Sequence, residues 1–419
     1  MKRGVILAVL MVLSAYAEAA SYYIKPRLET QVRKTSSDKR EIPFSSYLDS
    51  GLSDLPHSGT FDVSLKNERI FKQEQDEFDL YQAVFRMQDL GGLLGVSGGR
   101  QFISPGFHAY LMDGASLSLG KESWPVTVGL FGGIPRYIET GDFHGEAGLV
   151  SGMTLDMSMN EHMHTRFSAV YDKLDINEKN WSENETVLVG MSHSHQFGSK
   201  LSPSLYGTME YDTAGKTVET GLMGFSLQPL ARLYWNLEGG HYNTNRDRAR
   251  STIFGLYTTG PFYQARTGAN LTLIEDAGAV ADFALTGGYS YQRLEISSSA
   301  SKNGNIADAG FKFTIVPLHL DAGVTYRFYD SFGGRAHDVI VSLHDEPFDK
   351  AALDAGADFT KYSKITNDND TATSVFLMAG YELLKNLEIS AGGEYLRNNI
   401  FSSEWRATAK LGYKLEGKI

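Results

Sequence analysis

Cysteine is missing from this 419-residue sequence, which excludes disulfides, thiolate metal sites, iron–sulfur clusters and covalently attached haem within the chain. After its first residues the chain also lacks any stretch near the roughly 18 apolar residues of a membrane-spanning helix, so a helical membrane protein is excluded. An excess of basic residues is missing too. The formal net charge is -11, and we therefore expect no nucleic acid as a partner.

The start of the chain has the composition of an export signal. Lys2 and Arg3 precede an apolar run from Val5 to Leu13, and small residues that permit cleavage follow it. We expect residues 1–19 to be a signal peptide and the remaining chain to be exported.

The rest of the sequence alternates with a period of two. Near the end, one set of positions is apolar and the intervening set is polar: Trp405, Ala407, Ala409, Leu411, Tyr413 and Leu415 against Glu404, Arg406, Thr408, Lys410 and Lys414. A strand places alternate side chains on opposite faces, so this pattern predicts strands with one apolar and one polar face.

Three features favour a membrane barrel over a soluble sandwich, which also alternates. The alternating segments run for about 9–13 residues, the length of a tilted membrane strand. Aromatic residues such as Tyr211, Trp235 and Trp405 lie toward the ends of apolar faces, where an interfacial girdle needs them. Ionised groups lie deep within the polar faces. We predict an all-β, transmembrane antiparallel β-barrel of about 20 strands, with a range of roughly 16–22.

The barrel is expected to occupy residues 60–419. The polar segment 20–59 is expected to be a periplasmic N-terminal extension or a partial plug, with an added edge pairing through residues 22–32 as a further option. The acidic segment 347–370 is expected to be a long external loop that narrows the lumen.

Two further connections carry expectations of their own. Residues 259–261 read as a periplasmic turn that follows a strand at 249–259. Residues 295–307 read as a long loop on the side where short turns are expected, so either a strand is miscounted there or the loop reaches into the periplasm.

One hairpin carries a recognisable motif between residues 98 and 119. Its positions Gly99, Arg100, Gln101, Asp113 and Gly114 resemble the Gly-Arg-Gln … Asp-Gly hairpin of porin-like outer-membrane proteins, of the alginate-export type or the barrels of porin–cytochrome conduits. Arg100 and Asp113 lie symmetrically about the turn, which predicts a cross-strand ion pair. In each strand the charged residue falls on the same face as the apolar residues. The pair must therefore lie at the rim, beyond the lipid, or a bulge must move the two side chains to the other face.

The charged residues of the polar faces are expected to line the lumen: Glu146, Asp156, Arg166, Glu210, Arg232, Glu238, Arg266, Asp282, Asp321, Arg327, Glu388, Glu394, Arg406 and Lys410. They indicate either a solvated wall with internal ion pairs or a pore with a weak cation preference.

Four histidines form the only metal-like pattern. Symmetric pairing would set His162 opposite His195 and His164 opposite His193, but the parity of His164 and His193 differs. We interpret them as interfacial histidines and expect neither a metal ion nor a cofactor.

These patterns predict a porin-like channel of the cell outer membrane, surrounded by lipid, through which small hydrophilic solutes or ions diffuse passively. The alternative is a barrel sheath around a multihaem cytochrome, whose haems would belong to the partner because this chain has no Cys-x-x-Cys-His. A barrel enzyme is the least favoured hypothesis, because the histidines show no spacing to a serine or acid partner.

Overall fold

The computed structural model of the chain describes residues 20–34, 40–71, 75–106, 109–121, 123–136, 148–174, 184–198, 201–243, 261–297, 300–331, 334–364, 369–398 and 403–418. The expected signal peptide, the expected strand at 249–259 and the expected lumen residue Glu146 lie outside the described residues.

Nearly all described residues belong to one antiparallel sheet. Its strands are β1 (Ser21–Lys34), β2 (Arg40–Leu55), β3 (Gly59–Phe71), β4 (Gln75–Leu90), β5 (Leu94–Ile103), β6 (Tyr110–Leu119), β7 (Val126–Pro135), β8 (Leu149–Asn160), β9 (Met163–Leu174), β10 (Asn184–Gln196), β11 (Ser204–Asp212), β12 (Thr217–Leu230), β13 (Leu233–Tyr242), β14 (Phe262–Ala277), β15 (Val280–Ser297), β16 (Ala300–Ile315), β17 (Leu320–Ser331), β18 (Gly334–Phe348), β19 (Ala351–Lys364), β20 (Asn369–Leu384), β21 (Leu387–Arg397), β22 (Glu404–Tyr413) and β23 (Leu415–Lys418). A single 3₁₀ turn, η2 (Val316–Leu318), joins β16 to β17 in the described part of the chain. No helix among the described residues is long and apolar enough to cross a membrane.

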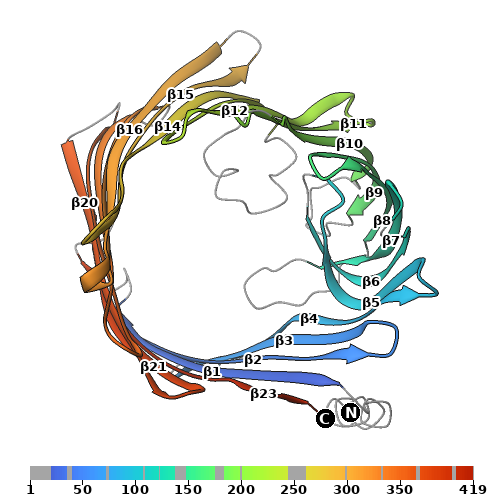
Figure 1. The fold of residues 1–419 in the computed structure, drawn as a ribbon, viewed down its shortest axis with the longest axis horizontal. Coiled ribbons are helices and arrows are strands. Elements are labelled where there is room, and N and C mark those ends of the chain that lie inside the picture. Colours follow the sequence, from blue (N-terminus) through green and yellow to red (C-terminus); the bar gives the residue numbers. More distant parts are fainter. Residues whose placement is uncertain are drawn as a thin grey trace.

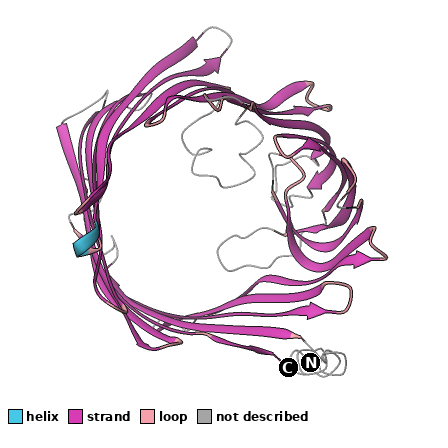
Figure 2. Cartoon of the chain, in the orientation of Figure 1, coloured by secondary structure: helices cyan, strands magenta, loops and turns pink. Residues whose placement is uncertain are grey.

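The sheet closes into a ring (Figures 1 and 2). Each strand pairs with its sequence neighbour, and β1 also pairs with β22 and β23. Because β23 continues β22 along the same edge of β1, the ring has 22 strands. The predicted antiparallel barrel is confirmed, and its strand number falls within the predicted range.

The two faces of the wall differ in the way the period of two predicts. Large apolar side chains are exposed on one face, among them Leu130 (50%), Met153 (47%) and Leu237 (46%). Neighbouring residues in each strand, such as Thr154 and Glu238, belong to the other face. An apolar surface that runs around a whole ring is the surface that lipid covers, so the polar face turns toward the lumen.

One rim of the ring carries the short turns. The described connections 56–58, 91–93, 161–162, 278–279 and 349–350 lie there, together with both ends of the described chain, since Ser21 pairs with Lys418. Short turns and chain termini mark the periplasmic end of an outer-membrane barrel, so the opposite rim is the external one.

The N-terminal segment is part of the wall, and the expectation of an extension or plug is wrong. β1 and β2 pair with each other throughout, and β3 and β22 flank them. Ile24 and Leu28 of β1 face outward at 39% and 40% exposure, whereas Arg27 and Glu29 face inward. The inward charges make the segment polar overall, which concealed its alternation. Edge pairing through residues 22–32 is the option that holds.

The described residues of the expected loops 295–307 and 347–370 belong almost entirely to strands. β15 runs to Ser297 and β16 begins at Ala300, while the 349–350 turn leads directly into β19. The end of β15 and the beginning of β16 form a long hairpin near the external rim. Water reaches both faces of a strand beyond the lipid, so apolar alternation is not needed there and the sequence resembles a loop.

The expected periplasmic turn at 259–261 is wrong as well. Tyr242 at the end of β13 pairs with Phe262 at the start of β14, and the Pro261 carbonyl accepts a hydrogen bond from the Glu295 amide. Pro261 therefore lies at the external rim, where β13 ends.

Candidate pore lining

Most of the predicted lumen residues share the inner face, where cross-strand pairs bring opposite charges together. Arg166 Nε lies 2.5 Å from Asp156 Oδ1, and Arg406 Nη1 lies 3.3 Å from Glu394 Oε2. Lys410 Nζ lies 4.0 Å from the carboxylate of Glu29 on β1. These distances fit the predicted wall of internal ion pairs.

The remaining predicted positions divide into two groups. The register places the following on the inner face: Glu210, Glu238, Arg266, Asp282, Asp321, Arg327 and Glu388. Glu210 is only 2% exposed. Arg232 is different, because it lies in the periplasmic turn after β12, half exposed and 3.7 Å from Glu275. Its partner Glu275 pairs in register with the inner residue Asp282, so Arg232 lies at the periplasmic mouth of the lumen, one residue before β13.

Charges on the first four strands were missed. Arg86 Nη1 lies 2.6 Å from Asp62 Oδ2, and the Tyr23 hydroxyl donates to Asp62 Oδ1 at 3.0 Å. Arg27 lies over the Tyr47 ring, 4.2 Å from its centroid. The alternation of charged and apolar residues around Arg27 was the signal that could have identified this part of the lining.

A cavity of about 960 Å³ lies at the periplasmic end of the wall. Lys25, Arg27, Asp49 and Glu388 line it from their strands, and Phe348 lines it from the end of β18. Cations and carboxylates therefore border the same space, which suits hydrated polar solutes.

The motif hairpin forms the predicted ion pair and extends it. Arg100 Nε and Nη2 donate to the two carboxylate oxygens of Asp113 at 2.6 and 2.8 Å, and Arg136 Nε donates to Asp113 at 2.7 Å. We call these three residues the rim triad. All three occupy outward-facing positions near the external rim. This is the rim location that was expected for an ion pair on the apolar face.

The rim triad lies at the point where strands β4 and β5 stop pairing with each other. Pairing between β4 and β5 stops at Ala83 and Arg100, although β5 continues to Ile103. Arg100 Nη1 donates to the Leu80 carbonyl of β4 at 2.9 Å, which satisfies an acceptor that β5 no longer reaches. At Gly99, φ is 120° and a Cβ would overlap the Ala83 carbonyl, so only glycine fits this junction.

Beyond the rim triad the β5–β6 connection turns into the barrel. The Ser104 carbonyl accepts a hydrogen bond from Arg166 Nη1 at 3.3 Å. A Cβ at Gly106 would lie 2.9 Å from Glu210 Oε1 and 3.1 Å from Ser168 Oγ. Residues 104–106, here called the inward tip, therefore cover the inner face of β9–β11. The expectation that 347–370 narrows the lumen is wrong, and the inward tip narrows it instead.

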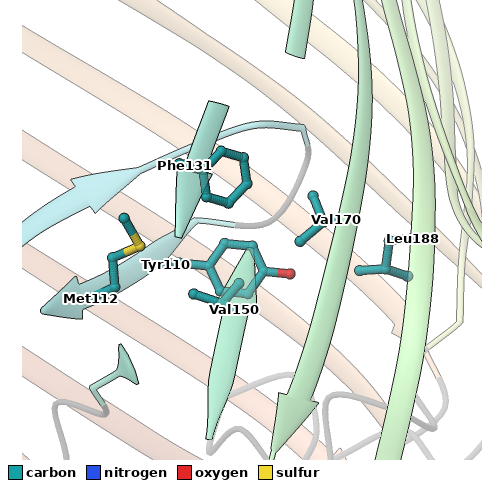
Figure 3. Close-up of a cluster of buried hydrophobic side chains, with 6 residues drawn as sticks. All are labelled: Tyr110, Met112, Phe131, Val150, Val170 and Leu188. Atoms are coloured by element: carbon teal, nitrogen blue, oxygen red, sulfur yellow. The ribbon is translucent and has the colours of Figure 1, made fainter. Parts of the chain in front are cut away.

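Below the inward tip lies an apolar cluster on the inner face (Figure 3). Its members are at most 8% exposed although they belong to the lumen side: Tyr110, Met112, Phe131, Val150, Val170 and Leu188. The Tyr110 hydroxyl donates to Asp172 Oδ2 at 3.3 Å, which links β6 to β9 across the cluster. These six side chains therefore pack this part of the lumen.

The histidines do not converge. His164 pairs in register with Ser194 and His193 with Thr165, one residue away from the symmetric pairing considered for a metal site. His193 Nδ1 lies 2.8 Å from Thr165 Oγ1, whereas His164 Nδ1 lies 3.0 Å from Ser158 Oγ on the other face. No cluster of three or more metal-ligating side chains occurs among the described residues.

Two solved structures from Pseudomonas aeruginosa share this architecture. OccK5 (OpdH) aligns with a TM-score of 0.50 at 9% identity, covering 96% of this chain and 99% of that chain. The outer membrane protein OpdK aligns with a TM-score of 0.50 at 8% identity, covering 96% of this chain and 100% of that chain. No family model and no curated protein matches the sequence. The chain has the fold of a porin-like outer-membrane β-barrel.

Proposed function

We propose that this protein is a channel of the cell outer membrane through which small hydrophilic solutes or ions diffuse passively. The observation that carries the proposal is the closed ring with an apolar outer face and a charged inner face. A charged lining replaces part of the hydration of a passing solute, and the lipid-facing surface keeps the ring in the membrane. Diffusion needs no catalytic residue and no cofactor, so we propose no enzymatic role.

The inner charges favour cations. On β16–β19 the described inner-face positions carry six carboxylates, Asp308, Asp321, Asp338, Glu346, Asp354 and Asp358, against Lys302, Lys312 and Arg327, with His344 beside Asp354. An excess of fixed negative charge raises the local concentration of cations over anions.

Single-channel conductance in a planar bilayer tests the proposal. We expect steady conductance of the purified protein and, in a salt gradient, a reversal potential of the sign set by cation preference. Asp354→Asn combined with Asp358→Asn is expected to reduce that potential, and Asp330→Asn on the outer face is the matched control. A folded barrel that does not conduct would contradict the channel.

The alternative is a sheath around a multihaem cytochrome, and the alginate-export type is the other prediction that the motif hairpin supports. A sheath requires a partner inside the lumen, so the isolated protein would conduct and the cytochrome would abolish the current. Recovery of a haem protein with the barrel during purification would favour the sheath.

A further inference from the structure

A row of inner-face positions crosses the cavity at the periplasmic end. Glu382 on β20 pairs in register with Glu388 on β21. Glu388 in turn pairs with Gly412 on β22, and Gly412 pairs with Arg27 on β1. All four residues line the cavity, and we call them the charge row. The charge row therefore places two carboxylates on one side of a glycine and a guanidinium on its other side.

The position between the two kinds of charge is open. Gly412 faces the lumen, since its neighbours Leu411 and Tyr413 face outward at 40% and 41% exposure. Apart from its chain neighbours, no described atom would lie within 4 Å of a Cβ at Gly412. Glu388 and Arg27 therefore border a gap that no side chain of β22 fills.

The charges beside this gap have no ion-pair partner among the described residues. No cation lies within 4.0 Å of the Glu382 or Glu388 carboxylate, and this includes Lys350, whose carbonyl accepts a hydrogen bond from the Glu382 amide. Arg27 lies over the Tyr47 ring instead, 4.2 Å from its centroid. A ring beneath a guanidinium fixes its position and leaves its charge. Fixed charges of opposite sign therefore face each other across an open gap.

We propose that the charge row binds a small zwitterion of the amino-acid type, with its ammonium between the two glutamates and its carboxylate on Arg27. An ammonium has several donors, which suits two carboxylates, and arginine presents a planar fork to a carboxylate. Glu388 and Arg27 rise from the same face two strand spacings apart, which is about 10 Å. A charge-assisted hydrogen bond of about 2.8 Å at each end leaves roughly 4 Å between the two charges of the ligand. A short α- or β-amino acid has this separation.

This inference rests on the proposed channel, because a solute reaches the cavity through the lumen. Binding is measured without conduction, so the two proposals fail separately. A barrel that binds the zwitterion through the charge row and conducts nothing would contradict the channel alone. A conducting barrel whose binding does not depend on the charge row would contradict this inference alone.

The test is a ligand-detected NMR titration of the purified barrel in mild detergent at about 0.1 M salt. The probes are of similar size and differ in charge: β-alanine carries both groups, propionate carries the carboxylate, and ethylamine carries the ammonium. We expect β-alanine to bind about fivefold more tightly than either single-charge probe, which is the strength of one exposed ion pair.

Variants of the charge row assign the two charges separately. Arg27→Gln should weaken β-alanine about fivefold and leave ethylamine unchanged. Glu382→Gln combined with Glu388→Gln should weaken β-alanine by a similar factor without weakening propionate. Gly412→Leu keeps every charge but fills the gap, so it should remove the preference for β-alanine over both single-charge probes.

The matched control is a trio of the same composition at the periplasmic mouth. Glu275 and Asp282 pair in register, and Arg232 lies 3.7 Å from Glu275, so the cation already has a carboxylate partner. Five strand spacings separate β15 from β20, which is about 24 Å along the wall and more than two screening lengths of about 10 Å. Arg232→Gln, and Glu275→Gln combined with Asp282→Asn, should therefore leave the affinity for β-alanine unchanged. Equal affinity for the three probes, or equal losses in the control variants, would overturn the proposal.

Heat-modifiable gel migration establishes that each variant is folded. If Arg27→Gln does not fold, Gly412→Leu carries the test, because a side chain at this position has space among the described residues. An unchanged preference for β-alanine in the Gly412→Leu variant would then overturn the proposal.

Discussion

At the scale of single residues, Arg100 connects three strands through the hydrogen bonds of one side chain. Its side chain is 12% exposed and donates to Asp113 through two nitrogens and to the Leu80 carbonyl through a third. A guanidinium is the only side chain that presents donors in this fork, and here it bridges β4, β5 and β6. Arg100 therefore closes the place where backbone pairing between β4 and β5 ends.

Replacing Arg100 should destabilise the barrel measurably. Arg100→Gln leaves the Asp113 carboxylate and the Leu80 carbonyl with fewer donors, and we expect a loss of about 2–3 kcal/mol in the free energy of unfolding. Urea unfolding in detergent micelles measures it. Arg335→Gln is the control, because its ion pair with Asp330 is exposed and should contribute less than about 1 kcal/mol. Equal losses in the two variants would show that Arg100 has no special structural role.

The sequence contained part of this site and not the rest. Arg100 and Asp113 lie symmetrically about a turn, so the antiparallel rule alone places them opposite each other. Arg136 joins them from the end of β7, and no local pattern relates it to the hairpin. The Leu80 carbonyl depends on the bulge in β4, which changes the register without any marker in the side chains.

At the scale of elements, the hairpin β5–β6 belongs to the wall at its periplasmic end and to the lumen at its external end. Its inward tip lies against Ser168 and Glu210, and the inner apolar cluster lies beneath it. Burial of Met112, Val150 and Val170, each at most 1% exposed, makes this arrangement a packed core. A packed core holds one conformation, so we expect the inward tip to be a fixed constriction.

A disulfide tests whether the inward tip moves. Gly106→Cys with Ser168→Cys places two thiols where a Cβ already approaches the Ser168 hydroxyl to 3.1 Å, and the chain has no native cysteine to interfere. We expect the disulfide to form readily and single-channel conductance to be equal before and after reduction. A current that rises on reduction would mean that the inward tip opens in the free protein.

Elements were predictable from sequence only where lipid touches them. Strand β22 has an apolar residue at each outward position and β8 at each but Ser151, because these positions contact hydrocarbon. The end of β15 and the start of β16 have no such requirement, and residues 300–305 resemble a polar loop although they pair with residues 291–297. The prediction thus failed in the external part of β15 and β16, and it also missed β1, β2 and β19, which cross the membrane.

At the scale of the whole molecule, closure depends on the two ends of the chain. β1 pairs with β22 from Arg27 to Arg33 and with β23 from Ser21 to Ile24, so the first and last strands share one continuous seam. The strand number was predictable to within a few strands, but membership of β1 and β2 in the ring was not. Their outward residues are moderately apolar and their inward residues are charged, which is also the composition of a polar extension.

Deletion of residues 21–58 tests whether this segment is part of the barrel wall or a plug inside it. A plug can be removed from a folded barrel, and its removal raises the conductance. Removal of β1 and β2 instead leaves the backbone edges of β3 and β22 unpaired in hydrocarbon, where each unsatisfied group costs several kcal/mol. We therefore expect the shortened protein, expressed with residues 1–20 retained, to fail to fold into membranes and to show no heat-modifiable band on gels. A stable, more conductive barrel would show that β1 and β2 are not needed for closure, and the ring would then have to close through β3 and β22.

Replacement of the turn residues 56–58 by Gly-Gly is the control, because it preserves both strands and should leave folding intact.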